Sequence, residues 1–239
     1  MSRRILSLLI GFAVACHVCP GPTYMRQAAA QTGLQALVAE GERLWTQSPD
    51  PSNPVACATC HRDPALTHGW AASFPKFKPL PPPHARVMTL LQANAEAVER
   101  HYRLHDPLPV ATAITTYLTS LGADVPISPG ISAGQPVFPV RMQALAASVV
   151  RGEGLYARIC GQCHKPAAAA ALVRAFPHVV EGRAESLERF IERHHSLGQH
   201  LSWGGQATAD IMAYLMSQAA GRPIGHHTYQ ASTEGKGGS

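Results

Sequence analysis

The chain is poor in the residues that build a strong protein-only core or a surface for polyanions. Aromatic residues make up 6% of its 239 residues and charged residues 15%. Small domains bury a modest share of their surface, so few aromatic side chains would leave their cores weak. The formal net charge is +5. Residues 1–30 contain three arginines and no acid, so the rest of the chain has a smaller net positive charge. A nucleic-acid partner therefore has no electrostatic support.

Long apolar runs are also missing, and the apolar stretch at residues 5–15 is too short for a confident membrane span. It follows Arg3 and Arg4, and the small residues 28–30 offer a cleavage site. This order is typical of an export signal. We therefore expect residues 1–30 to be a signal peptide and the protein to be periplasmic. An uncleaved signal that anchors the chain to the membrane is the alternative.

Cysteine is scarce and unevenly placed. Of six cysteines, Cys16 and Cys19 lie in the predicted signal, and the other four stand in two copies of Cys-x-x-Cys-His. This pattern is the attachment site of a c-type haem, in which each thiol forms a thioether and the histidine binds the iron. The sequence therefore predicts two haem c groups. Their covalent anchors would be Cys57, Cys60, Cys160 and Cys163, and their proximal iron ligands His61 and His164.

The same cysteines allow three other interpretations. Two Cys-x-x-Cys pairs could bind zinc, but a zinc site does not need a histidine directly after both pairs. A thioredoxin-like redox pair would belong to a βαβ unit, and no strand-rich stretch is evident. Structural disulfides between the pairs are the third alternative. The repeated histidine favours haem, which would also supply apolar surface to two small cores.

The second half of the sequence repeats the first in the same order. Matching segments are 41–45 and 152–156, 74–75 and 176–177, 99–101 and 192–194, and 114–118 and 211–215. Apolar spacing predicts first helices over 34–45 and 147–156, middle helices over 87–102 and 184–195, and closing helices over 111–121 and 207–219. Contacts between first and closing helices would be Trp45 with Tyr117, and Tyr156 with Tyr214.

Helices before and after each motif resemble the class I cytochrome c fold. The resemblance implies an all-α protein of two tandem cytochrome c-like domains, each wrapped around one covalently bound haem. Domain 1 would comprise residues 31–123 and domain 2 residues 144–221. The proline- and glycine-rich residues 124–143 would form a linker, and residues 222–239 a disordered tail.

The sixth ligand of each iron decides what the haem does. Between His164 and the closing helix there is no methionine or cysteine, so the second iron takes a histidine or stays open. Adjacent side chains on a helix point about 100° apart, so His194 and His195 cannot both face one iron. The repeat favours His194, because His101 has the same place in copy one, where Met88 competes with it. The full set of histidine candidates at the second iron is His178, His194, His195 and His200.

Two family resemblances follow from these residues. Residues 184–195 and 210–215 are similar to the distal half of the sphaeroides haem protein family. Its members are monohaem cytochromes with a displaceable asparagine ligand, and they can bind small gases. His194 and His101 match the asparagine position. The two-domain layout resembles the SoxA and thiosulfate dehydrogenase group of dihaem cytochromes, which use a cysteine as an axial ligand. No cysteine follows Cys60 in copy one or Cys163 in copy two, which argues against sulfur-oxidation chemistry.

We therefore expect an exported dihaem cytochrome c that carries electrons between redox partners in the periplasm or inner membrane. Its two haems would have bis-histidine ligation, which implies lower potentials than histidine–methionine ligation. Electron transfer is favoured over catalysis, and no catalytic residue is assigned. The alternatives are a dihaem oxidoreductase acting on sulfur compounds, a small-gas-binding haem protein, and a subunit of a larger oxidoreductase.

Overall fold

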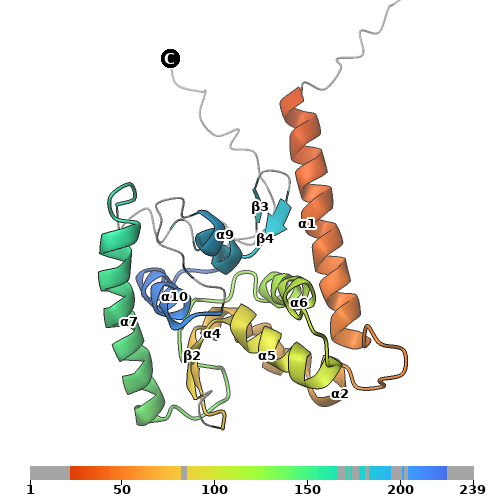
Figure 1. The fold of residues 1–239 in the computed structure, drawn as a ribbon, viewed down its shortest axis with the longest axis horizontal. Helices are drawn as coiled ribbons and strands as arrows, with labels where there is room; N and C mark the ends of the chain where they lie inside the picture. The colour runs from red at the N-terminus through yellow and green to blue at the C-terminus, as the bar shows by residue number, and fades with distance from the viewer. Residues whose placement is uncertain are drawn as a thin grey trace, which may run out of the picture.

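The computed structural model describes residues 22–81, 85–165, 171, 173, 178–180, 183–194, 201 and 204–224. This part of the chain is mostly helical, with two small hairpins (Figure 1). The helices of the first half are α1 (Pro22–Thr46), α2 (Cys57–Cys60), α3 (Pro64–His68), α4 (Trp70–Ser73), α5 (Leu90–Tyr102) and α6 (Leu108–Leu121). Those of the second half are α7 (Pro139–Ile159), α9 (Leu187–His194) and α10 (Gln206–Gln218). The strands are β1 (Lys76–Lys78), β2 (Arg86–Met88), β3 (His178–Val180) and β4 (Arg183–Glu185).

In each half, the second strand of a hairpin lies where the sequence predicted the first turn of the middle helix. Strand β1 pairs antiparallel with β2, and β3 with β4. In each half a hydroxyl residue follows the second strand and caps the helix that comes next. The Thr89 hydroxyl accepts from the main-chain N–H of Gln92 at 3.1 Å, and the Ser186 hydroxyl from that of Arg189 at 3.3 Å. These caps set the starts of α5 and α9, which periodicity alone put three residues too early.

Each half is built on a pair of helices that cross at a glycine. Helix α1 packs on α6, and α7 packs on α10. A Cβ atom at Gly41 would overlap the carbonyl oxygen of Ala113, and one at Gly152 would overlap that of Asp210. Only a residue without a side chain lets the two backbones come this close. The same crossing is therefore present twice.

An aromatic pair lies beside each crossing. The rings of Trp45 and Tyr117 are 6.4 Å apart and tilted by 48°. Those of Tyr156 and Tyr214 are 5.2 Å apart and tilted by 45°. Both contacts between first and closing helices were predicted from the sequence, and both are present.

The hairpin of each half packs against helices of the other half (Figure 1). Strands β1 and β2 of the first half contact α7, and β2 also contacts α10; strands β3 and β4 of the second half contact α1. The buried core is continuous, since it joins Leu44 and Ile114 to Ile191 and Ile211. The division into domains at residues 31–123 and 144–221 therefore stays a prediction.

Helix α7 begins earlier than expected. Residues 139–143 fall in the predicted linker but form the first turn of this helix. Proline is favoured in a first helical turn, where its missing N–H would have no partner, and Pro139 occupies that position after the extended residue Phe138. The linker proper is therefore shorter than predicted.

The start of the linker is bonded to both halves. The main-chain N–H of Ser128 donates to Ala72 at 2.8 Å, and that of Ile127 donates to Arg222 at 2.9 Å. Ile127 is 1% exposed and Ile224 3%. The last described residues, 222–224, were expected in a disordered tail but are held against this segment, whereas residues 225–239 lie outside the described residues.

The predicted signal peptide lies mostly outside the described residues, and so do Cys16 and Cys19. Helix α1 begins at Pro22, inside the predicted signal, and its early part extends away from the rest of the fold (Figure 1). Among the helices that are described, none is both long and apolar enough to cross a membrane.

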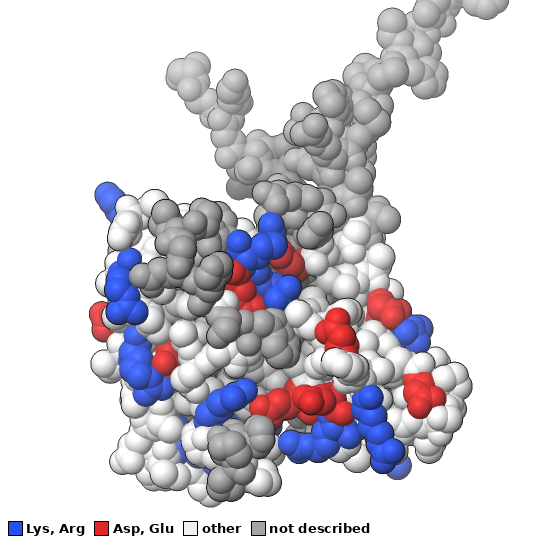
Figure 2. Space-filling view, viewed as in Figure 1, with Lys and Arg blue, Asp and Glu red and all other residues white. Residues whose placement is uncertain are grey.

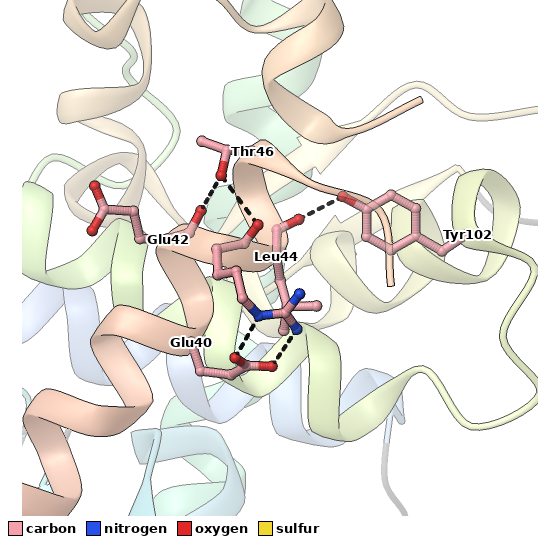
Figure 3. Close-up of polar contacts among 6 residues, drawn as sticks. Glu40, Glu42, Leu44, Thr46 and Tyr102 are labelled. Carbon is pink, nitrogen blue, oxygen red and sulfur yellow. Dashed lines mark hydrogen bonds and ion pairs between the residues drawn. The ribbon is translucent and has the colours of Figure 1, made fainter. Parts of the chain in front are cut away.

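Tyr102 fastens the end of α5 to the end of α1 (Figure 3). Its hydroxyl donates to the carbonyl oxygen of Leu44 at 2.6 Å and accepts from the main-chain N–H of Cys57 at 3.3 Å. Tyr102 is 3% exposed, so water does not replace these bonds. One side chain thus joins two helices to the first Cys-x-x-Cys-His segment.

Tyr102→Phe should lower the free energy of unfolding by about 2 kcal/mol, because a buried carbonyl and a buried N–H lose their partner. Chemical denaturation followed by circular dichroism measures this change. Tyr117→Phe is the matched control, since no hydrogen bond joins the Tyr117 hydroxyl to a described residue. Equal unfolding free energies for the two variants would contradict the expectation.

Candidate functional site

The first Cys-x-x-Cys-His segment is a single helical turn. The main-chain N–H of His61 donates to the carbonyl oxygen of Cys57 at 3.0 Å. Residues three apart share a face of a helical turn, so the turn brings both thiols to one side. Cys57 is half-buried beside Tyr102, 3.5 Å from its hydroxyl, and Cys60 is exposed. Burial raises the pKa of the Cys57 thiol, which favours its neutral form.

The second segment repeats this turn at the end of α7. The N–H of His164 donates to Cys160 at 2.8 Å, and that of Cys163 to the same carbonyl at 3.1 Å. Cys160 is buried and Cys163 exposed, so the first cysteine is again the less accessible one, and burial raises the pKa of the Cys160 thiol. Residues 166–170, which follow this turn, lie outside the described residues.

The four thiols do not combine with one another. None of the four cysteines of the two segments forms a disulfide, so no such bond joins the pairs. Within the described residues, no three His, Cys, Asp or Glu side chains gather as they would around a zinc ion. The described residues therefore form two separate Cys-x-x-Cys-His turns and not one four-cysteine site.

The helix crossings position the motif histidines. The His61 ring lies 5.9 Å from the ring of Trp45 and 4.9 Å from that of Trp70. In the second half the Tyr156 hydroxyl donates to the carbonyl oxygen of His164 at 3.2 Å. Burial, and then the charges of Lys78 and His101, lower the pKa of His61. Its neutral imidazole is therefore favoured, and this is the form that binds metals.

A cleft of about 660 Å³ opens beside Cys60 and His61. Its volume is in the range of cofactor sites. Helix α5 lines it with Leu90, Ala93 and Ala97, and much of the remaining lining is aromatic or basic. A thiol and an imidazole at the edge of an apolar cleft with cationic groups fit a covalently attached haem.

Basic side chains would meet the acidic groups of such a haem. The cleft is lined by Arg62, Lys76, Lys78 and Arg141, with Asp63 as an acid among them. The Lys76 ammonium donates to the hydroxyls of Ser73 (3.0 Å) and Ser132 (2.8 Å), and burial lowers its pKa to about 8. Elsewhere, on the face shown in Figure 2, acidic and basic side chains are interspersed.

The structure separates the candidates for the sixth ligand. Met88 is 0% exposed and does not line the cleft. His101 is exposed on α5, and its carbonyl oxygen accepts from the Asn53 amide at 2.8 Å. His194 is the last residue of α9, but its side chain lies outside the described residues, as do His195 and His200 entirely. The backbone of His178 is in β3, and its side chain is not described either.

The structural register corrects one match of the repeat. Strands β2 and β4 begin 97 residues apart, at Arg86 and Arg183, and so do α5 and α9, at Leu90 and Leu187. This offset pairs His194 with Ala97, which is one helical turn before His101. The match of residues 99–101 with 192–194 was therefore wrong by four residues, because it followed identities at the helix end and not the caps.

Sequence reasoning missed most of the cleft lining, including Lys76, Lys78 and Met142. Lys76 and Lys78 lie on a strand that periodicity did not reveal. Met142 falls in the predicted linker, yet it lines the cleft from α7. The only available signal was Pro139, which marks a possible helix start just before it.

No protein-family model and no curated protein matches the chain. Among solved structures, it is similar to a chain of the crystal structure of SoxXA from P. pantotrophus, with a TM-score of 0.62. The similarity covers 80% of this chain and 76% of that chain, at 15% sequence identity. At this identity the likeness concerns the fold, and it supports a cytochrome c-like fold for the present chain.

Proposed function

We propose that the chain is an exported dihaem cytochrome c that carries electrons between redox partners in the periplasm or inner membrane. The observation that carries this proposal is the repeated attachment turn, which follows an equivalent glycine crossing and aromatic pair in each half. Two such turns with directly following histidines are what covalent haem attachment requires. The fold likeness to a chain of SoxXA supports the same class of protein.

The residues of the chain would hold each haem and shield its iron. The anchors are Cys57, Cys60, Cys160 and Cys163, the proximal ligands are His61 and His164, and His194 is the sixth ligand of the second iron. A bound haem iron supplies reversible one-electron transfer at a potential set by its ligands and surroundings. Trp45 and Trp70 hold the His61 ring in place. The apolar side chains of α5 keep water away, and the basic residues of the cleft pair with propionates.

Haem counting tests the proposal. Protein produced in a host that attaches c-type haem should carry two porphyrins, seen by intact mass and by peroxidase stain after denaturation. A Cys57→Ala/Cys60→Ala variant should lose one of them, and so should Cys160→Ala/Cys163→Ala, because each pair would anchor its own haem. The variant lacking all four cysteines should carry none.

The masses of wild type and of the three variants also define the contrary outcomes. Wild type without covalent porphyrin would overturn the proposed function. The dihaem assignment would be overturned if wild type carried one porphyrin and only one of the two double-cysteine variants lost it. The protein would then be a monohaem cytochrome.

A second candidate function is oxidation of small sulfur compounds, or binding of a small gas, at an iron that opens. It is favoured by the fold likeness to a chain of SoxXA and by the basic lining of the first cleft, which suits an anion. Carbon monoxide added to the reduced protein, and thiosulfate or sulfite added to the oxidised protein, distinguish it from a carrier. A carrier with two stable six-coordinate irons would keep its absorption spectrum in both experiments.

A further inference from the structure

The helix face that lines the first cleft offers no iron ligand at the position where the second half has His194. The structural register pairs His194 with Ala97, and Ala97 lines the cleft together with Ala93 and Asn94 of α5. A methyl group cannot bind iron. The Asn94 amide nitrogen donates to the Thr115 hydroxyl at 2.8 Å, so this side chain is already engaged. A sixth ligand for the first iron must come from another element.

The two sequence candidates are poorly placed for this cleft. Met88 is fully buried in β2, and moving its side chain toward the cleft would break the core around it. His101 lies one turn beyond Ala97 and is exposed, but it is not among the cleft-lining residues. Its backbone is also tied to the segment before the first motif by the Asn53 amide.

Met142 is the methionine that does line the cleft. It stands in the first turn of α7, so it is supplied by the second half of the chain, whereas His61 follows α2 in the first half. In Figure 1 the start of α7 and α2 lie on opposite sides of the lower part of the molecule. His61 and Met142 therefore line the same cleft from two different elements.

The Met142 side chain is supported from behind. It is half-buried and, like Phe77, packs against the small cluster of Val87, Leu145 and Ala213. Gly130 lies against it, since a Cβ there would come 3.0 Å from the Met142 sulfur. The Gly130 N–H donates to Ser73 at 2.9 Å, which fixes this part of the linker. A thioether held in place by packing needs little rearrangement to bind iron.

The amine nitrogens that line the cleft belong to two lysines. The Lys76 ammonium is engaged by two serine hydroxyls and lies 4.4 Å from the centre of the Phe74 ring. Lys78 has its charge near Arg141 and Arg100, and it suits a propionate better than an iron. Thioether sulfur is also the common partner of histidine at haem irons that carry electrons.

We propose that Met142, from the first turn of α7, is the sixth ligand of the iron held by His61, so that the second half of the chain completes the haem site of the first. This inference rests on the proposed function. The first haem would then have histidine–methionine ligation and the higher potential, and the second, with His194, bis-histidine ligation and the lower one. Electrons would leave the second haem for the first.

The oxidised absorption spectrum tests the ligand. Wild type should show the weak far-red band of methionine–iron ligation, and Met142→Leu, which conserves side-chain volume, should abolish it. The reduction potential of one haem should fall in this variant, and carbon monoxide should bind the reduced protein at one iron. Met88→Leu and His101→Ala are the matched controls and should keep the band and both potentials. Circular dichroism melts establish that each variant is folded. If Met142→Leu is unstable, Met142→His, which keeps a side chain able to bind iron, takes its place.

The contrary outcomes are distinct from failure of the proposed function. Absence of the band in wild type, its persistence in Met142→Leu, or its loss in Met88→Leu would overturn the inference while two covalent haems remain. A histidine–histidine signature that disappears in His101→Ala would do the same and restore the ligand favoured by the sequence. Protein without covalent haem would instead overturn the function itself.

Discussion

Gly152→Ala should lower the free energy of unfolding by about 3 kcal/mol or more, the upper part of the range for overpacked sites. The added Cβ would overlap the carbonyl oxygen of Asp210 and lie 3.0 Å from the Cβ of Tyr214. Neither neighbour can move freely, because both belong to α10. The helices must separate, and the Tyr156–Tyr214 contact beside the crossing would open. Gly41→Ala should act in the same way at the crossing of α1 and α6.

Each half provides a matched control on the same helix. Gly154, two residues further along α7, has nothing within 4 Å of an added Cβ, and neither does Gly33 on α1. Alanine at these exposed helical positions should stabilise the protein by about 0.5–1 kcal/mol, because glycine loses more backbone entropy on folding. Denaturant titrations of the four variants measure the differences. Similar midpoints for Gly152→Ala and Gly154→Ala would contradict the close crossing.

The second large effect concerns a buried carboxyl group between the halves. Glu188, in the first turn of α9, is 6% exposed. It accepts hydrogen bonds from the hydroxyls of Ser186 and Thr89 and from the main-chain N–H of Leu91. Two helix starts, one from each half, therefore share this side chain. Burial is the largest influence and raises the pKa of Glu188, against the opposing effect of these bonds.

Wild type should lose stability as pH rises, because Glu188 ionises, and Glu188→Gln should not show this loss. A carboxyl whose pKa is higher in the folded than in the unfolded protein binds its proton more tightly when folded. Stability is then greatest at acidic pH and declines as pH rises from about 4.5 through the folded-state pKa. A neutral amide keeps an acceptor for Leu91 and does not ionise. The difference in unfolding free energy between variant and wild type should therefore move in favour of the variant from pH 4 to pH 8.

Glu188→Leu separates the hydrogen bonds from the charge. It leaves two hydroxyls and one N–H without their acceptor and should cost about 3 kcal/mol at every pH. Burial raises the pKa of Glu192, and the charge of Glu188 adds to this effect against the opposing influence of Arg189. Removing the Glu188 charge therefore also eases the ionisation of Glu192, which acts in the same direction and favours the variants at high pH. The expectation is wrong if the difference in unfolding free energy between Glu188→Gln and wild type moves in favour of wild type from pH 4 to pH 8. That result would mean that the helix starts hold the carboxylate ionised.

The Cys-x-x-Cys-His turns and the helix pairs were predictable from the sequence, because each has a local signature. The Cys-x-x-Cys-His spacing defines a motif, and apolar spacing reveals a helix that buries one face. Trp45 and Tyr156 could be matched with Tyr117 and Tyr214 because aromatic residues stand at equivalent places in both copies. These predicted contacts are present at ring distances of 6.4 and 5.2 Å.

The cleft could not be predicted, because residues distant in sequence form it. Strands β1 and β2 have three residues each, too few for a period to emerge. Met142 looked like part of a linker, since prolines and glycines precede it, although Pro139 in fact begins a helix. The match of His101 with His194 was wrong because it relied on identical residues at the helix ends. The helix starts, which the hydroxyls of Thr89 and Ser186 fix, give the correct register.

The packing of each hairpin against the other half imposes an order on synthesis and maturation. Strands β1 and β2 are made before α7, so the first half has no surface to receive them until residue 159 has left the ribosome. During that interval the pocket beside Cys60 lacks the side that Arg141 and Met142 later close. The enzyme that attaches the cofactor would meet an open substrate there, and completion of the chain would then close the pocket over the attached group.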